Sequence, residues 1–332
     1  MQNPLPENFT LRPATMDDAG AVSDLVNACD MALIGKPRLS ADEIRHDWSQ
    51  PSFKLDDDTR LVFGPDGALV GYAVLWDATP HVRAFASLDV HPDAWGGGVE
   101  LALAQWIEQR ARRLIPQAPN GARVVLAQDK LNIHGVAREL LLGQGYQIVR
   151  HGLQMLIEME APPEPLIPEG FAIRPFIRGK EERAVVTAIR EAFTGHYGYV
   201  LSPFEEDLEY WRHYFDTAPD AIPELWFVAV EANSAGETIV GTSLCHPEVT
   251  EDPDMGWVFA LGVRPPWRQR GLGLALLQTS FAGLYRHGKR KAGLSADAEN
   301  LTGAVRLYEK AGMHVMYQID VYEKELRAGT SL

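Results

Sequence analysis

The segment RPPWRQRGLGLALL, residues Arg264–Leu277, decides how the second half of this chain is interpreted. It follows the apolar run WVFALGV (Trp257–Val263), which predicts a β-strand, and it opens a leucine-rich helical pattern. The free N–H groups and the positive dipole end of such a helix favour an anion. Its two glycines would let phosphate oxygens approach the backbone. The segment therefore predicts an anion-binding turn.

The charge pattern around this turn favours a ligand with several phosphates. The chain has a formal net charge of −14, yet it contains no Asp or Glu from Met255 to Ala296. A local reversal of charge in an acidic chain attracts a polyanion. Seven basic residues fall inside that window, namely Arg264, Arg268, Arg270, Arg286, Lys289, Arg290 and Lys291.

Three phosphate-binding motifs can be compared with the turn. A Walker loop requires GxxxxGK[ST], which the segment lacks. A dinucleotide-binding fingerprint requires a third glycine where Leu276 stands, and an acidic residue about twenty positions further on. The next acidic residue is Asp297. The pattern [R/Q]xxGx[G/A] after a β-strand does fit, through Arg268, Gly271 and Gly273.

A second motif follows the turn. The segment DAENLTGAVRLYEKAGM (Asp297–Met313) fits the pattern NxxAxxLYxxxGF, with Met313 in place of the usual aromatic residue. The two motifs in this order resemble those of the GNAT acetyltransferase superfamily, whose pyrophosphate loop has the first pattern. The residues that match the second motif are Asn300, Ala304, Leu307, Tyr308 and Gly312.

An internal repeat indicates two domains of similar architecture. Each repeat contains strands stopped by proline and a helix that ends in glycine before a further strand. Three pairs of segments occur in the same order: FTLRPAT (Phe9–Thr15) with FAIRPFI (Phe171–Ile177), FASLDVHPD (Phe85–Asp93) with FALGVRPP (Phe259–Pro266), and ELLLGQGYQIV (Glu139–Val149) with RLYEKAGMHVM (Arg306–Met316).

The proline-rich residues 161–170 predict a stiff linker between the two repeats. We therefore expect one domain over 1–160 and a second, catalytic domain over 171–332. This layout is similar to that of tandem GNAT proteins of the mycothiol synthase-like group. The resemblance implies an α/β fold of two acyl-CoA N-acyltransferase domains. Each would be a mixed, mostly antiparallel sheet flanked by helices.

The resemblance implies acetyl-CoA as co-substrate and acyl transfer to the primary amine of a small molecule. A backbone N–H of the Leu261–Val263 strand edge would stabilise the developing oxyanion. Asn300 would cap its helix and hold the pantetheine region. The residues expected to bind acetyl-CoA are Leu261, Gly262, Val263, Arg268, Gln269, Arg270, Gly271, Leu272, Gly273, Leu274, Asn300 and Tyr308.

Tyr308 is the candidate general acid for the departing thiolate. A phenol stays protonated at neutral pH and can donate a hydrogen bond to sulfur. The competing interpretation is that Tyr308 is a core aromatic residue, because it shares a helical face with Leu301, Ala304 and Val305. With both motifs present, we favour the catalytic interpretation.

The general base is less clearly indicated. The mycothiol synthase-like group carries a glutamate on the strand that enters the turn, where this chain has Trp257. Asp254, His246 and Glu248 lie just upstream and are the candidate replacements, although His246 at a strand end also fits a structural role. The basic run Arg286–Lys291 fits either a ligand contact or a solvated helix end.

The acceptor pocket is expected to use residues Phe193–Phe215. Aromatic side chains beside the acidic residues of this segment would suit a cationic acceptor, and an amphipathic helix that buries its aromatics in the core explains them equally well. The aromatic residues are Phe193, Tyr197, Tyr199, Phe204, Tyr210, Trp211, Tyr214 and Phe215, and the acidic ones are Glu205, Glu206 and Asp207.

The first repeat lacks several of these features. Trp95 stands in place of the arginine, and Glu100 in place of the last glycine, where a carboxylate would repel pyrophosphate. Asn132 persists in the second motif, but Leu141 replaces the tyrosine. We expect this domain to be non-catalytic, although the three glycines from Gly96 to Gly98 leave a second CoA site open.

Composition narrows the class of protein. The negative charge argues against binding to nucleic acids or anionic membranes. Cys29 and Cys245 are far apart and lack metal-ligand spacing, so we expect no metal and a reducing compartment. No signal-peptide pattern and no long apolar run is visible. We expect a cytoplasmic monomer or homodimer.

Two other functions remain open from the sequence. A non-catalytic acyl-CoA-binding protein, acting as a sensor or regulatory partner, would need the same glycine-containing turn. An acyltransferase that uses a longer acyl-CoA would need it too. Tyr308 favours an enzyme, whereas the missing glutamate favours the binding protein.

Overall fold

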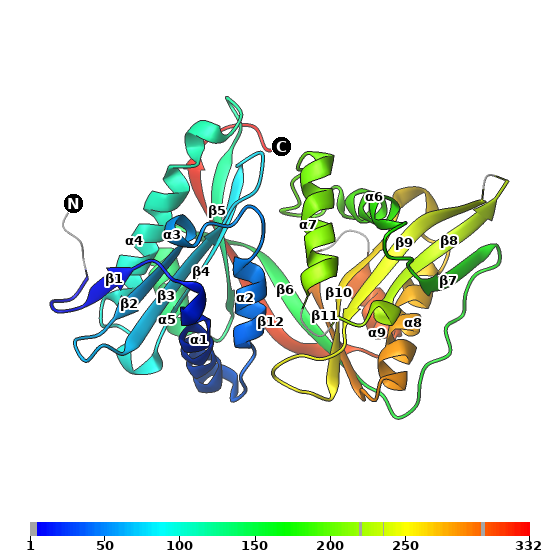
Figure 1. Cartoon of the computed structure of the whole chain (residues 1–332), viewed down its shortest axis with the longest axis horizontal. Helices are drawn as coiled ribbons and strands as arrows, with labels where there is room; N and C mark the ends of the chain where they lie inside the picture. The colour runs from blue at the N-terminus through cyan, green and yellow to red at the C-terminus, as the bar shows by residue number, and fades with distance from the viewer. Residues whose placement is uncertain (1–4, 219–220, 235, 300–302) are drawn as a thin grey trace. The chain divides into compact units, whose positions relative to one another are not determined.

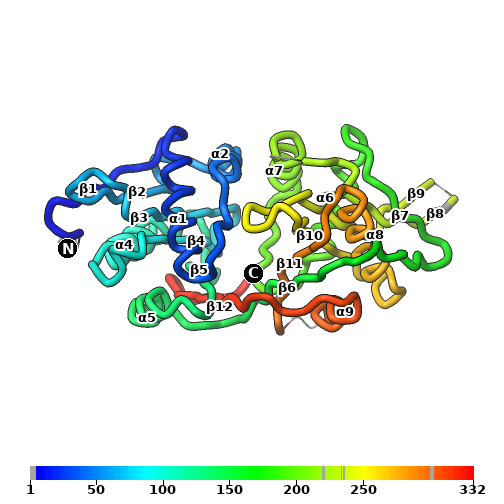
Figure 2. Tube along the Cα trace, turned by 90° about the horizontal axis from the view of Figure 1, so that it is seen from below, coloured from blue at the N-terminus to red at the C-terminus, as the bar shows by residue number. Residues whose placement is uncertain are grey.

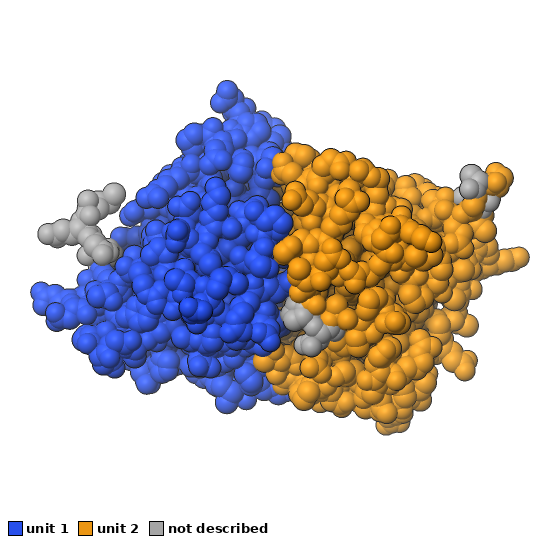
Figure 3. Space-filling view, in the orientation of Figure 1, with its two compact units in different colours: residues 1–151, 319–332 blue, residues 152–318 orange. Residues whose placement is uncertain are grey.

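The computed structural model describes residues 5–218, 221–234, 236–299 and 303–332. These residues form two compact units, which Figure 3 shows in different colours. Unit 1 comprises Met1–His151 together with Ile319–Leu332, and unit 2 comprises Gly152–Gln318. Among the described residues, no helix is both long enough and apolar enough to span a bilayer.

Unit 1 is a sheet with helices on both faces (Figure 1). Its strand order is β1-β2-β3-β4-β5-β12, and only the β4–β5 pair is parallel. The strands are β1 (Thr10–Arg12), β2 (Thr59–Phe63), β3 (Leu69–Trp76), β4 (Arg83–Val90), β5 (Val124–Leu131) and β12 (His314–Arg327). The helices are α1 (Ala19–Ile34), α2 (Ala41–Trp48), α3 (Leu55–Asp58), α4 (Val99–Arg112) and α5 (Gly135–Gly143).

Alternating burial along the strands explains the layers of unit 1. In β4, every second side chain is buried, as expected for a strand that packs one face on a helix. Leu103 and Ile107 of α4 and Leu141 of α5 form one core with β2–β5. Residues of α1 and α2 form a second core on the opposite face of the sheet (Figure 2).

Unit 2 repeats the same architecture. Its strand order is β6-β11-β10-β9-β8-β7, and here only the β10–β11 pair is parallel. The strands are β6 (Gln147–Glu158), β7 (Phe171–Pro175), β8 (Trp226–Asn233), β9 (Gly236–His246), β10 (Met255–Val263) and β11 (Lys291–Asp297). The helices are α6 (Glu182–Phe193), α7 (Phe204–Thr217), α8 (Leu272–Arg286) and α9 (Ala304–Lys310).

Two cores also lie on the two faces of unit 2. Residues of α8 and α9 pack on one face, and residues of α6 and α7 pack on the other (Figure 2). The mixed, mostly antiparallel sheet with flanking helices that the sequence predicts for each half is therefore confirmed.

The compact units depart from the expected division at residues 161–170. Residues Gly152–Glu158 pair with β11 and so belong to unit 2, whereas Ile319–Arg327 pair with β5 and complete unit 1. The final strands of the two repeats follow equivalent helices and have equivalent patterns. A repeat alignment alone therefore cannot show that the two strands are exchanged.

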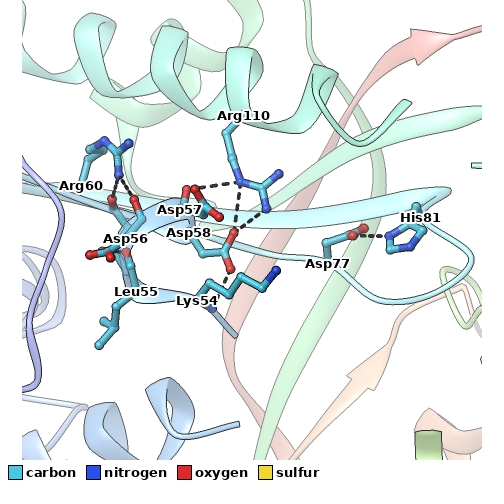
Figure 4. A network of polar contacts seen from close by, with 10 residues as sticks. Lys54, Leu55, Asp56, Asp57, Asp58, Arg60, Asp77, His81 and Arg110 are labelled. Atoms are coloured by element: carbon cyan, nitrogen blue, oxygen red, sulfur yellow. Dashed lines mark hydrogen bonds and ion pairs between the residues drawn. The ribbon is translucent and has the colours of Figure 1, made fainter. Parts of the chain in front are cut away.

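A polar network lies beside the last turn of α4 in unit 1 (Figure 4). The Asp58 carboxylate is buried and accepts hydrogen bonds from Arg110 at 2.7 Å and from the Lys54 amide at 2.9 Å. The His81 ring lies against Asp77 in the same view. These groups hold α3 and β2 against the last turn of α4.

Candidate active site

The candidate site of unit 2 is built where two parallel strands diverge. β10 and β11 pair from Met255, opposite Lys291, to Val258, opposite Leu294. Both strands, whose residues are all described, continue beyond this point without pairing with each other. A bulge between Val258 and Ala260 interrupts the pairing of β10 with β9 at the same level. Among the residues that the structure describes, the edge of β10 after this point has no strand partner on the β11 side. It can therefore bond an extended ligand.

The turn that follows β10 has the backbone of an anion-binding site. We define the glycine turn of unit 2 as Arg268–Gly273. Gln269 and Gly271 both have positive φ, 61° and 85°, and Gly271 is the N-cap of α8. Within the described chain, no side chain caps this helix end. The first amides of α8 are thus left for an outside acceptor.

The two glycines serve different purposes. Gly271 is required by its left-handed backbone, which residues with a side chain seldom adopt. Gly273 is required by a close approach, because a Cβ atom there would lie 3.1 Å from Cδ1 of Leu307 in α9. The turn is therefore held tightly between α8 and α9.

Arg268 supports the turn through backbone carbonyls. Its Nε donates to the Val263 carbonyl at 3.0 Å, and its Nη2 donates to the Ala192 carbonyl at 2.7 Å. It thereby joins the end of β10 and the end of α6 to the glycine turn. From the sequence, we expect Arg268 to bind the ligand. In the structure its guanidinium donates hydrogen bonds to two backbone carbonyls and so supports the turn.

The surplus of basic residues in the sequence is largely balanced in space. Arg264 pairs with Glu191 at 2.8 Å, Lys289 with Glu248 at 2.9 Å and Lys291 with Asp252 at 2.7 Å. Arg270 lies 3.7 Å from Glu231. The charge argument for a polyanion is thus weaker than the sequence suggests, and the backbone of the turn becomes the stronger argument.

Tyr308 lies in the core between α9, α8 and the sheet. Its side chain is 8% exposed and shares a hydrophobic cluster with Leu272 and Leu276. Burial raises the pKa of Tyr308 to about 12, so the phenol stays protonated at neutral pH. Packing and proton donation are compatible at this position. Asn300 lies outside the described residues.

The structure separates the candidate bases. The His246 ring lies 4.6 Å from that of Phe259, and its Nε2 is 2.9 Å from the Tyr214 hydroxyl. Asp254 precedes β10 and accepts a hydrogen bond from the Arg290 amide at 3.2 Å. At the rise of a β-strand, Asp254 is about 23 Å along the chain from Leu261. The structure therefore does not bring Asp254 to the glycine turn, and Glu248 is bound to Lys289.

The aromatic segment from Phe193 to Phe215 is divided between core and surface. Phe215 is 2% exposed and packs with Trp211 and Tyr214 on Trp226, as the core interpretation predicts. Tyr197 and Tyr210 are exposed, at 40% and 45%. The loop between α6 and α7 is the part of this segment that approaches the divergence of β10 and β11.

Sequence reasoning missed His196, which this loop carries. Its ring lies 5.1 Å from that of Phe193, and Phe193 packs beside Gly262 of β10. The available signal was the run TGHYG, in which two glycines flank a histidine and a tyrosine. Such a run predicts a tight turn with a fixed side-chain direction.

Unit 1 contains the corresponding turn, and there the Gly96 amide already donates a hydrogen bond to a side chain of the protein. The two turns match in their backbone: Gly98 is the N-cap of α4 at φ 93°, and Gly96 has φ 75° where Gln269 has 61°. Glu100 is 7% exposed, and its carboxylate accepts a hydrogen bond from the Gly96 amide at 2.7 Å. The sequence predicts that Glu100 would repel a pyrophosphate, and in the structure its carboxylate lies inside the turn.

Other side chains of unit 1 fill the divergence of β4 and β5. The Trp95 indole donates to the Val90 carbonyl at 2.7 Å, as Arg268 does to Val263. The buried Lys130 ammonium crosses from β5 to the Leu88 carbonyl of β4 at 2.6 Å. The carbonyls of Val90 and Val263 are thus bonded from within their own turns in both units, whereas the Lys130 bond to the Leu88 carbonyl is a feature of unit 1.

Comparison with known families decides the assignment. The model of the acetyltransferase (GNAT) family matches residues 24–132 and 186–313. The chain belongs to the GNAT acetyltransferase family. Both matched regions contain a glycine turn, so this GNAT acetyltransferase carries two copies of the family fold, and the predicted class of enzyme is confirmed.

Similar GNAT proteins cover almost the whole chain. A mycothiol acetyltransferase of Geodermatophilus obscurus is 31% identical over 320 residues, which cover 94% of this chain and 96% of that protein. The mycothiol acetyltransferase of Streptomyces scabiei is 32% identical over 259 residues, 76% of this chain and 75% of that protein. The predicted resemblance to this group is therefore confirmed.

Solved structures agree with the tandem arrangement of this GNAT acetyltransferase. A GCN5-related N-acetyltransferase of Sphaerobacter thermophilus has a TM-score of 0.80 and 37% identity, and the match covers 99% of both chains. A tandem GNAT protein from the clavulanic acid biosynthesis pathway has a TM-score of 0.70, with coverage of 96% of this chain and 98% of that one. At 14% identity, the second match concerns the fold alone.

Proposed function

We propose that this enzyme transfers the acetyl group of acetyl-CoA to the primary amine of a small molecule, and that the chemistry takes place in unit 2. One contrast carries the proposal. In unit 1 the Glu100 carboxylate occupies the amide of the turn, whereas unit 2 has Gly273 at that position and no side chain of the described residues caps α8. The first amides of α4 and of α8 are both uncapped, but in unit 1 the Glu100 carboxylate already lies in the turn and would compete with an outside phosphate.

The glycine turn would hold the pyrophosphate of acetyl-CoA. The amides from Gln269 to Leu274 would face the phosphates at the uncapped start of α8, and Arg268 would support them through its bonds to the ends of β10 and α6. The pantetheine arm would then follow the β11-facing edge of β10, where the register with β11 ends at Val258 among the described residues. Such an arrangement would place the thioester between β10 and β11.

The chemistry follows from groups at this divergence. The amine nitrogen attacks the thioester carbonyl, and a backbone N–H of Leu261–Val263 stabilises the oxyanion. The C–S bond then breaks, and the thiolate takes the proton of Tyr308. Burial raises the pKa of Tyr308, and it raises the pKa of a thiol in the same site for the same reason, which keeps the transfer feasible.

The acceptor is proposed only as a class. The mycothiol acetyltransferase relatives support a small amine acceptor. Trp257 stands where the mycothiol synthase-like group carries its glutamate, so a mycothiol precursor is not proposed specifically.

The proposal is tested by amine-dependent release of the CoA thiol. The purified protein is mixed with acetyl-CoA and a panel of small primary amines, and acetylated products are identified by mass spectrometry. We expect thiol release only with certain amines, and an acetyl group on their nitrogen. Binding of acetyl-CoA without transfer to any amine would instead favour the non-catalytic binding protein.

A further inference from the structure

The loop between α6 and α7 folds back on itself at His196. Gly195 and Gly198 both have left-handed backbones, with φ of 84° and 74°. The His196 amide donates to the Phe193 carbonyl at 2.9 Å, and the two rings meet edge to face with 5.1 Å between their centroids. The two left-handed glycines allow the chain to turn tightly here, and the edge-to-face contact with Phe193 orients the His196 ring.

This loop is fixed against the diverging strand of the site. A Cβ atom on Gly262 would lie 2.7 Å from Cβ of Ala192 and 3.5 Å from the Phe193 ring, so the end of α6 rests directly on β10. Arg268 bonds to the Ala192 carbonyl at 2.7 Å and ties the same helix end to the glycine turn. The end of α6 is thereby fixed beside β10, and the His196 ring packs on the Phe193 ring that lies there.

Charged groups from both arms of the divergence act on His196. Burial lowers the pKa of His196, the positive charge of Arg268 lowers it further, and the negative charge of Asp297 opposes them. Arg268 comes from the turn after β10, and Asp297 ends β11. The phenol of Tyr199, which also packs on Phe193, has a pKa raised by burial. His196 is therefore neutral at pH 7.

The ring of His196 is also available for a proton. Among the described residues, neither of its ring nitrogens has a hydrogen-bond partner. The His246 ring differs, because its Nε2 lies 2.9 Å from the Tyr214 hydroxyl. A neutral imidazole with an available nitrogen can accept a proton, and Asp297 favours the imidazolium once it forms.

We propose that His196 accepts the proton of the attacking amine in the acetyl transfer of unit 2, an inference that rests on the proposed function. The C–N bond forms while the amine nitrogen becomes positive, and that nitrogen gives a proton to His196. The C–S bond breaks, and the thiolate takes the proton of Tyr308. The imidazolium and the Tyr308 phenolate then recombine their proton through solvent, which restores both groups.

The test compares His196→Gln with a matched surface control, His314→Gln. His314 is exposed at the start of β12 and takes no part in the site. First, acetyl-CoA is titrated calorimetrically into the wild type and both variants. We expect affinities within about threefold of one another, since His196 is proposed to act on the amine. Failure of the wild type to bind acetyl-CoA would refute the proposed function itself.

The second measurement is the NMR signal of the His196 ring, assigned by its loss in His196→Gln. If the ring lies at the thioester, as the proposal requires, acetyl-CoA should shift this signal and leave that of His314 unchanged. A His196 signal that does not respond to bound acetyl-CoA would overturn this inference and leave the proposed function intact.

The third measurement is the pH dependence of kcat/KM with glucosamine as the amine probe. Protonation of His196 below its pKa removes the base, so the wild-type rate should fall on the acidic side. His196→Gln should lose that limb and turn over about 100-fold more slowly at pH 7.5, within the range of general-base contributions. A variant with the wild-type rate and the wild-type acidic limb would show that His196 is not the base.

Discussion

In unit 1 the Glu100 carboxylate accepts a hydrogen bond from the Gly96 amide at 2.7 Å, inside the turn that matches the glycine turn of unit 2. An anion supplied by the protein itself therefore occupies the backbone that would otherwise face a phosphate. The corresponding residues of unit 2 are Gln269 and Gly273, and Gly273 has no side chain to play this part. The two turns have similar backbone conformations. They differ in that a side chain of the protein supplies the hydrogen-bond acceptor in unit 1, whereas Gly273 of unit 2 has no side chain to do so.

The first prediction concerns Glu100→Ala. The change leaves the Gly96 amide without its acceptor, and because Gly96 itself is exposed, water can replace that acceptor, so unfolding should become easier by only about 0.5–1.5 kcal/mol in urea denaturation. Glu100→Gln keeps an oxygen acceptor and is the matched control. We expect no second acetyl-CoA site in Glu100→Ala, because Trp95 and Lys130 still fill the strand edges. A new site with unchanged stability would contradict this account of unit 1.

The second prediction concerns Tyr308→Phe. Only the hydroxyl is removed, so the packing of the ring in the α8–α9 core is retained. Turnover should fall by about one to three orders of magnitude, as for loss of a general acid, while calorimetric affinity for acetyl-CoA stays nearly the same. A variant that turns over at the wild-type rate would identify Tyr308 as a packing residue.

The third prediction separates the glycine turn from backbone strain. Gly271→Glu places a carboxylate at the start of α8 and should abolish acetyl-CoA binding. Gly288→Glu is the matched control, because Gly288 has almost the same left-handed φ, 87° against 85°, at the other end of α8. Both changes strain the backbone, and only the first should affect binding in calorimetry. Retained binding in Gly271→Glu would remove the turn from the site.

The fourth prediction concerns Arg268→Lys. A lysine keeps the charge but cannot bond the Val263 and Ala192 carbonyls with one planar group. Stability should decrease by about 1–2 kcal/mol, and acetyl-CoA should bind about tenfold more weakly because the turn loses its support. Arg286→Lys, on an exposed residue of the last turn of α8, is the control. Equal affinity in both variants would show that Arg268 does not organise the turn.

The glycine turn could be predicted because its geometry is local. Gly271 is needed for a left-handed N-cap, and a strand before it with a helix after it is visible in the apolar pattern. The close contact of Leu307 on Gly273 and the bonds of Arg268 to Ala192 depend on α9 and α6. These tertiary contacts were not visible in the sequence.

Residues near in sequence were poor guides to the base. Asp254 and Trp257 are three residues apart, but an extended strand carries each residue about 3.3 Å further from the site. His196 precedes β10 by a whole helix and two strands, and it follows the end of α6, where Phe193 packs beside Gly262. Packing of α6 on the sheet, rather than spacing along the chain, is the reason for proposing this histidine as the base.

The exchange of the last strands between the two repeats also could not be predicted from the sequence. Ile319–Arg327 and Gly152–Glu158 end equivalent repeats, and either could in principle complete either sheet. The proline-rich residues 161–170 suggested a simple boundary, whereas the structure assigns the end of the chain to unit 1. The same repeat that revealed two domains therefore concealed which strand completes each.

The most direct test of the central claim is the stoichiometry of acetyl-CoA binding to the full chain, measured by isothermal titration calorimetry. If unit 2 holds the donor and Glu100 closes unit 1, one molecule should bind per chain, and Gly271→Glu should abolish that binding. Two sites per chain, or one site that survives Gly271→Glu, would contradict the account.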